Sequence, residues 1–404
     1  MIEMNMSKTL LLAVVLLLIG RLIRSKVSFL RKYCIPDAVV GGLLFSTLTF
    51  ILYQSDIVSF QFDGTLQTFF MNIFFTASGF EAGASLIKKS GGKLGIFIVL
   101  AALLAFLQNV VAVGLSGILG VEPLIGLMTG SIPMTGGHGN AAAFAPIAEE
   151  MGATGAVTVA VAAATFGLVS GSMVGGPTAN RLITKNGLMA KRKLQTTSGQ
   201  IEALEEDIEE TPLLSGARIS KAAFLVFIAL GIGAYLADLF KVILPNVTLP
   251  IHVMGMIGGA VVRNVYDKIS KEENPTQLPE ISIIGDVTLG LFVTMAVMTM
   301  KLWELTSLAI PLIILLLAQV VLIYIFVMLF TYKLMGKDYD AAVMTAGHIG
   351  FGMGAVPVSM ANMKAVCEKY EYSKIAFIIV PVVGGMFSNF TNAAIITGFL
   401  NFLG

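Results

Sequence analysis

The stretches Pro133-Met-Thr-Gly-Gly-His-Gly-Asn140 and Thr345-Ala-Gly-His-Ile-Gly-Phe-Gly-Met-Gly354 place glycine-dense, polar backbone inside a chain that is otherwise mostly apolar. Lipid admits such backbone only where it is buried in protein or lines a wet cavity, because an unpaired N–H or C=O group in hydrocarbon costs several kcal/mol. Each stretch lies at a corresponding place in its half of the chain. Paired glycine-broken segments of this kind are typical of the substrate site of a secondary transporter.

The composition of the 404 residues indicates a membrane protein. Hydrophobic residues make up 56% and charged residues only 13%, whereas roughly a quarter of the residues of a soluble domain are charged. The net charge of +1 points neither to nucleic acid nor to a strongly acidic partner. The two cysteines, Cys34 and Cys367, offer neither a disulfide framework nor a metal-ligand spacing.

Ten windows of about 20 apolar residues predict ten transmembrane helices. The predicted spans are 8–24, 36–53, 66–87, 94–119 and 154–176 in the first half, and 221–243, 249–265, 280–300, 305–334 and 375–403 in the second. Between the fourth and fifth span of each half, the polar, proline-containing or glycine-rich segments 124–147 and 341–363 are predicted to be re-entrant hairpins. The predicted fold is therefore an all-α membrane protein of two five-helix halves, residues 1–180 and 222–404.

Charged residues in the loops predict the orientation of these spans. Basic residues gather at loops that would share one side of the membrane: Lys88, Lys89, Lys93, Arg263, Lys268, Lys271, Lys333, Lys337, Lys364, Lys369 and Lys374. If that side is the cytoplasm, both termini are outside and the polar linker Arg181–Lys221 is inside. With five spans before and after this linker, the halves have opposite orientations and form an inverted-topology repeat. A weak echo between Ile35-Pro-Asp-Ala-Val-Val-Gly41 and Leu249-Pro-Ile-His-Val-Met-Gly255 agrees with the repeat.

The tips of the two predicted hairpins are the candidate binding site. Glycine lets the backbone adopt a positive φ and bring its N–H groups close to a carboxylate, and the N-termini of half-helices favour an anion. The candidate substrate-binding residues are Ser131, Thr135, Gly136, Gly137, His138, Gly139, Asn140, Thr345, His348, Gly350, Gly352 and Gly354. The candidate ion-binding residues are Ser359, Asn362, Asn389 and Asn392. The alternative for the glycines is close helix packing, and for the two histidines a backbone hydrogen bond in place of substrate contact.

The remaining polar residues of the predicted spans favour Na⁺ over a proton as the coupling ion. They are few: Glu81, Gln108, Asn109, Asp286 and Ser388. A proton-driven machine is expected to bury several carboxylates, whereas carbonyl and hydroxyl oxygens suit Na⁺. The chain carries no H-E-x-x-H, Walker or C-x-x-C motif, so neither an enzyme nor ATP-driven transport is expected.

Several motifs together resemble those of the bacterial sodium/glutamate symporter family. They are Val27-Ser-Phe-Leu-Arg-Lys-Tyr33 followed by Ile35-Pro36 and Gly41-Gly42, Gly136-Gly-His-Gly139, Ala164-Thr-Phe-Gly-Leu168, Lys301-Leu-Trp-Glu-Leu305, Met335-Gly-Lys-Asp-Tyr-Asp-Ala-Ala-Val343, Ala346-Gly-His348, Gly350-Phe-Gly352, Gly354-Ala355 and Ala361-Asn-Met363. The resemblance covers nearly the whole chain. It implies Na⁺-coupled uptake of L-glutamate across the bacterial inner membrane, a homodimer, and elevator-type motion against a dimerising scaffold. The chain departs from the family at Asn389, where an acid is often found.

Three other functions fit the residues alone. The chain could be a Na⁺-coupled symporter for another anionic substrate such as a dicarboxylate, a cation/proton antiporter with a buried titrating carboxylate, or a passive channel whose hairpins form a filter. Two single hairpins from opposite sides favour a carrier over a channel.

Overall fold

The structure is a computed structural model, and it describes residues 2–55, 58–82, 91–190, 192, 215–243, 249–270, 278–305 and 308–404. Eight helical segments of this part of the chain are long and apolar enough to cross a membrane. They are α1 (Met6–Lys26), α3 (Asp37–Gln54), α6 (Gly91–Ile118), α9 (Ala156–Lys185), α11 (Gly216–Ile243), α13 (Leu278–Met298), the run α14 (Ala309–Phe326), η2 (Val327–Thr331) and α15 (Tyr332–Leu334), and the run α18 (Lys374–Pro381), η3 (Val382–Phe387) and α19 (Ser388–Leu403). The chain is a multi-pass, all-helical membrane protein, as its composition predicts.

Two more helices occupy the other predicted spans. α4 (Thr65–Gly79) lies within the predicted span 66–87, of which residues 83–87 are outside the described residues. α12 (Ile251–Ile269) covers the predicted span 249–265. The two pack against each other, and α4 also lies along α13. The side chains of Arg263 and Asn264 on α12 donate to the carbonyls of Phe80 and Ala82, which close the C-terminal end of α4.

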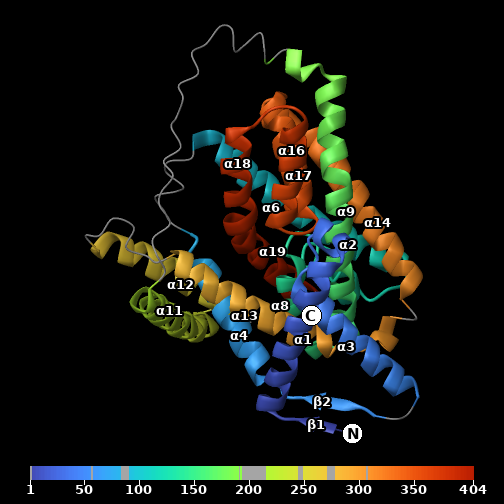
Figure 1. Ribbon diagram of the computed structural model, residues 1–404, viewed down its shortest axis with the longest axis vertical. Coiled ribbons are helices and arrows are strands. Elements are labelled where there is room, and N and C mark those ends of the chain that lie inside the picture. Colours follow the sequence, from blue (N-terminus) through green and yellow to red (C-terminus); the bar gives the residue numbers. More distant parts are fainter. Residues whose placement is uncertain are drawn as a thin grey trace.

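One group of helices consists of α1, α3, α4, α11, α12 and α13, which pack on one another (Figure 1). Glycines allow two pairs of helices in this group to cross at short distance. A Cβ built at Gly20 on α1 would lie 2.8 Å from the backbone nitrogen of Gly41 on α3. In the same way, a Cβ built at Gly233 on α11 would lie 2.7 Å from the backbone nitrogen of Gly255 on α12. Small residues at these positions let the helix backbones approach, as is common in membranes.

The second group contains α6, α9, α14, α18 and α19 together with two interrupted helix pairs. The first pair is α7 (Pro123–Leu127) and α8 (Gly137–Glu150), and the second is α16 (Tyr339–Gly352) and α17 (Val356–Lys369). In Figure 1 α16, α17 and α18 lie away from α11 and α12. Contacts between the two groups run chiefly through α13, which touches α8 and α9, and through α12, which touches α19.

Helical geometry changes in the middle of two apolar runs. The segment from Ala309 to Leu334 contains the π-helical stretch η2, and the segment from Lys374 to Leu403 contains η3, which follows Pro381. Proline removes a donor from the helix ladder, and π-helical turns are frequent at functional sites.

Short elements complete one end of the molecule. β1 (Ile2–Met4) pairs in parallel with β2 (Phe60–Phe62), so the N-terminus lies beside the connection that follows α3. The Tyr53 ring at the end of α3 stacks on Trp303, 4.0 Å between centroids, in the 3₁₀ turn η1 (Leu302–Leu305). A five-residue helix, α2 (Ser28–Lys32), follows α1.

Candidate functional site

The first interrupted pair turns sharply between α7 and α8. Residues 128–136 form successive turns, held by backbone bonds from Gly136 N–H to the Ser131 carbonyl, 2.9 Å, and from Gly137 N–H to the Pro133 carbonyl, 3.0 Å. Gly137 begins α8 with a φ of +62°, a conformation that glycine adopts without the strain a Cβ brings. The chain therefore needs glycine at this point of the turn.

The second pair breaks at Met353–Ala355, between α16 and α17. The Ser359 hydroxyl on α17 donates to the Gly347 carbonyl on α16 over 2.7 Å, and a Cβ built at Gly350 would lie 2.5 Å from the Ser359 backbone nitrogen. α9 lies against this pair at a row of glycines. The Asn362 amide of α17 donates over 3.0 Å to the carbonyl of one of them, Gly171.

The tips of the two pairs touch. A Cβ built at Gly137 would lie 2.8 Å from the Gly354 carbonyl oxygen. Gly137 is the first residue of α8, and Gly354 comes two residues before the first residue of α17. Because the first N–H groups of a helix have no intrahelical acceptor, two positively polarised helix ends lie next to each other here. This is a place where an anion can be held by backbone N–H groups.

Gln108, in the middle of α6, links both tips. Its Nε2 donates to the Gly352 carbonyl over 2.7 Å, and its Oε1 accepts from the Thr135 hydroxyl over 2.7 Å. Gln319 on α14 donates to the Gln108 carbonyl over 2.9 Å. Gln319 was missed by the sequence analysis, although a glutamine within a run as apolar as α14 is a detectable signal.

The two hairpin histidines bind threonine hydroxyls. His138 on α8 lies 3.0 Å from Thr165 on α9. His348 on α16 lies 2.9 Å from Thr331 in η2 and is surrounded by aromatic rings, with the Phe97 ring centroid 5.0 Å away and Phe351 stacked at 4.9 Å. Neither partner is the backbone group that sequence reasoning considered.

Three further candidates lie apart from the contact between the tips. Thr345 donates to the Ala341 carbonyl of its own helix, and Asn389 donates to the Gly385 carbonyl one turn earlier. Gly139 faces α4 and α13, since a Cβ there would lie 3.5 Å from both Phe74 and Leu289. The structure therefore brings Thr135, Gly136, Gly137, Gly352 and Gly354 together at the tips.

Polar groups of α6 and α19 hold the turn after α7. The Asn109 Oδ1 accepts from the Ser131 backbone N–H over 2.7 Å, and the Asn392 Nδ2 donates to the Ser131 carbonyl over 3.0 Å. Asn109, Ser131 and Asn392 are completely buried. No group of three or more His, Cys, Asp or Glu side chains in the described part of the chain could hold a metal ion.

A cavity of about 320 Å³ lies between α4 and α13. Phe74, which faces Gly139, is part of its lining, as are Glu81 and Asp286. A Cβ built at Gly385 would lie 3.7 Å from both the Glu81 carboxylate and Val356, the first residue of α17. The Glu81 carboxylate of this cavity therefore lies near the start of α17.

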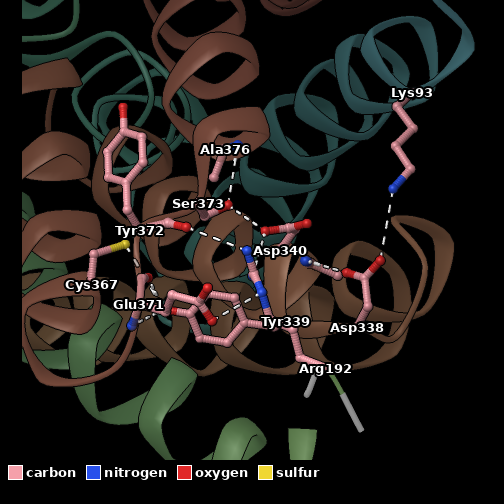
Figure 2. Close-up of polar contacts among 11 residues, drawn as sticks. Lys93, Arg192, Asp338, Tyr339, Asp340, Cys367, Glu371, Tyr372, Ser373 and Ala376 are labelled. Carbon is pink, nitrogen blue, oxygen red and sulfur yellow. Dashed lines mark hydrogen bonds and ion pairs between the residues drawn. The ribbon is translucent and has the colours of Figure 1, made fainter. Parts of the chain in front are cut away.

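Arg192, which follows α9 in the sequence, binds the second pair at the end opposite its tip (Figure 2). The guanidinium group pairs with Asp340 and Glu371, each over 3.1 Å, and lies over the Tyr339 ring. The Ser373 hydroxyl donates to the same Asp340 carboxylate over 2.7 Å. Arg192 thus binds a residue at the start of α16 and a residue just after the end of α17. The sequence has no periodic signal for this contact.

Comparison with known proteins places the chain in a family. Residues 2–372 match the family model described as sodium/glutamate symporter. A sodium/glutamate symporter of Haemophilus influenzae is 37% identical over 393 residues, which are 96% of this chain and 95% of that protein. The protein of the same name from Escherichia coli K12 is 36% identical over an alignment of 405 positions, which covers 99% of this chain and 98% of the relative. This chain belongs to the sodium/glutamate symporter family.

Proposed function

We propose that the chain is a secondary active transporter that takes up L-glutamate together with Na⁺ across the bacterial cytoplasmic membrane. The observation that carries the proposal is the contact between the tips, Gly137 against the Gly354 carbonyl, in a member of a family of symporters. The names of the relatives at 36–37% identity support both the substrate and the ion. Transport by such a protein needs no catalytic group and no cofactor other than the coupling ion.

The substrate site is proposed to lie between the tips. The backbone N–H groups at the starts of α8 and α17 suit a carboxylate, and Thr135 and Gln108 place a hydroxyl and an amide beside them. The proposed substrate-binding residues on the first tip are Thr135, Gly136, Gly137, His138, Gly139 and Asn140. Those on the second are Thr345, His348, Gly350, Gly352 and Gly354. Ser359, Asn362 and Asn389 remain proposed ion-binding residues.

The proposed architecture is an inverted repeat, in which the two interrupted pairs are re-entrant hairpins. Equivalent contacts in the two halves support it. The close crossing of α1 and α3 at Gly20 and Gly41 has its counterpart at Gly233 and Gly255 between α11 and α12. Each half also carries one interrupted helix pair before its last long helix. The homodimer implied by the family resemblance remains a prediction.

The positions of the loops support both termini being outside. At one end of the molecule, Tyr53 stacks on Trp303, Gly155 lies against Glu304, and Gly404 lies against Met151. At the other end, Arg192 binds Asp340, and Lys93 pairs with Asp338 over 3.8 Å. These are the two sets of loops that the basic residues assign to the outer and cytoplasmic sides.

We further propose elevator-type alternating access. The helices that carry the tips form one group, and the group of α1, α3, α4, α11, α12 and α13 touches it through few elements. A limited interface allows one group to slide against the other as a rigid body. The cavity lined by Glu81 and Asp286 would then be the cytoplasmic path to the site.

Uptake by intact cells tests the substrate and the ion. In cells that lack their own glutamate uptake, expression of the chain should give uptake of radiolabelled L-glutamate in sodium medium and almost none when choline replaces sodium. Excess unlabelled glutamate should abolish the signal. If citrate competes and glutamate does not, the chain transports a dicarboxylate in place of the amino acid.

Thiol labelling tests the inverted repeat. In a background without Cys34 and Cys367, single cysteines at Glu150 and Glu368 should respond differently to a membrane-impermeant thiol reagent outside whole cells. Both side chains are exposed at the ends of α8 and α17. Position 150 should react and position 368 should react only after the cells are opened. Glu149 is the poorer choice, because its carboxylate accepts from the Val157 N–H at the start of α9. Equal labelling in whole cells would contradict the opposite orientation of the hairpins.

A further inference from the structure

Three buried side-chain oxygens near the turn after α7 have no hydrogen-bond partner among the described residues. They are the Ser131 Oγ, the Ser388 Oγ and the Asn392 Oδ1. The three side chains are at most 3% exposed. Burying an oxygen without a partner is unfavourable, so three close together in the fold call for an explanation.

Hydrogen bonds and helix geometry define the neighbourhood of these oxygens. The Asn392 Nδ2 donates to the Ser131 carbonyl, which also accepts from the Gly136 N–H. This bond sets the orientation of the Asn392 amide and leaves its Oδ1 without a donor. Ser388 lies one turn before Asn392 on the same face of α19. Because side chains tilt toward the N-terminus of their helix, the Asn392 amide leans toward the turn that carries Ser388.

Asn109 on α6 positions this group. Its Oδ1 accepts from the Ser131 backbone N–H over 2.7 Å, and a Cβ on Gly130 would clash with it. The Ser131 backbone is therefore held from both sides, by Asn109 through its N–H and by Asn392 through its carbonyl. A fixed backbone places the Ser131 hydroxyl with little freedom to move away.

Neutral oxygens that are buried and preorganised suit a monovalent cation. Hard cations take oxygen ligands, and in transporters Na⁺ is held by carbonyls and side-chain oxygens beside unwound helix segments. The turn after α7 is such a segment, and the stretch just before Ser388 departs from α-helical geometry as a π-helix. The side-chain hydrogen bonds that hold Ser131 in the described part of the chain are made by amide groups, so the oxygens of this group are neutral.

We infer that Ser131, Ser388 and Asn392 form a Na⁺ site between the first hairpin and α19, with Asn109 as a positioning residue. The inference rests on the proposed function and deepens it, because it separates an ion site at the base of the first tip from the substrate site between the tips. Gly136 links the two, since its N–H holds the Ser131 carbonyl while it directly precedes Gly137. A cation bound to Ser131 therefore stiffens the turn that presents Gly137 to the substrate.

The test uses the purified full-length chain and sodium chloride alone, without glutamate. Thermal unfolding is followed against increasing sodium chloride, with choline chloride keeping the ionic strength constant. The wild-type chain should be stabilised by Na⁺. The Na⁺ concentration for half the stabilisation should rise by about tenfold or more in Ser388→Ala and in Ser131→Ala, as expected for the loss of a ligand or its support.

Ser116→Ala is the matched control. Ser116 is also completely buried and lies on α6, but its hydroxyl donates to the Val113 carbonyl of its own helix over 2.8 Å. Its Na⁺ titration should match that of the wild type. If Ser388→Ala does not fold, Ser131→Ala decides the question by itself.

Two results would contradict the proposed Na⁺ site. One is an unchanged Na⁺ titration in the folded serine variants, which is the result for oxygens that face only an ordered water. The other is the absence of any Na⁺-specific stabilisation of the wild type. Failure of the proposed function would look different, because the Na⁺ titration would persist while sodium-driven glutamate uptake was missing.

Discussion

Gly137→Ala is expected to abolish glutamate uptake while the protein still folds and reaches the membrane. At a φ of +62° a Cβ costs about 1–2 kcal/mol of backbone strain. The added carbon would also lie 2.8 Å from the Gly354 carbonyl oxygen, so the tips would have to separate. Displacing positioned groups by about 1 Å can cost about 100-fold in rate. Initial rates of radiolabelled glutamate uptake, corrected for protein in the membrane, measure the effect.

Gly120→Ala separates strain from contact. Gly120 has a similar φ of +67°, but nothing lies within 4 Å of a Cβ built there. This variant should keep most of its uptake. Equal loss of uptake in both variants would mean that backbone strain alone is responsible. Near wild-type uptake in Gly137→Ala would show that the tips are not part of the transport site.

The interruption of both helix pairs could be predicted because it depends on residues within each segment. Glycine-dense backbone and Pro133 disfavour a continuous membrane helix, whereas Pro146 lies inside α8 without ending it. The structure accordingly places turns at 128–136 and a break at 353–355. The proposed roles of individual residues at the tips remain predictions.

Contacts across the sequence could not be predicted from local pattern. Gln108 binds the Gly352 carbonyl across 244 positions, and Asn392 binds the Ser131 carbonyl across 261. The sequence showed these side chains as isolated amides in apolar runs, which need partners without indicating which. Arg192 lies in a polar stretch interpreted as a solvated linker, yet it pairs with Asp340 and Glu371.

Two predicted spans show a further limit of predicting membrane helices from windows of apolar residues. α4 and α12 form helices where spans were predicted, but neither is among the eight described segments that meet the length and hydropathy expected of a crossing helix. α12 instead buries glycines and Arg263 against its neighbours. Helices packed inside a bundle need less apolar surface than helices that face lipid.

Glutamate accumulation is expected to require an inward Na⁺ gradient and to need no proton gradient. The side chains that hydrogen-bond to the two helix pairs near their tips are neutral, among them the amides of Gln108, Asn362 and Asn392. Neutral oxygens hold Na⁺ without releasing a proton, whereas proton coupling uses titrating side chains. The carboxylates of Glu81 and Asp286 line the cavity beside α4 and α13. Glu81→Gln should therefore keep its Na⁺ dependence, and a shift to a pH-driven requirement would favour an antiporter.

The most direct measurement is uptake by purified protein in sealed proteoliposomes with imposed ion gradients. With Na⁺ outside and choline inside, at equal pH on both sides, labelled L-glutamate should rise inside above its external concentration and fall back when a sodium ionophore dissipates the gradient. Accumulation driven by a proton gradient in sodium-free buffer, or simple equilibration of glutamate that no gradient alters, would contradict Na⁺-coupled symport.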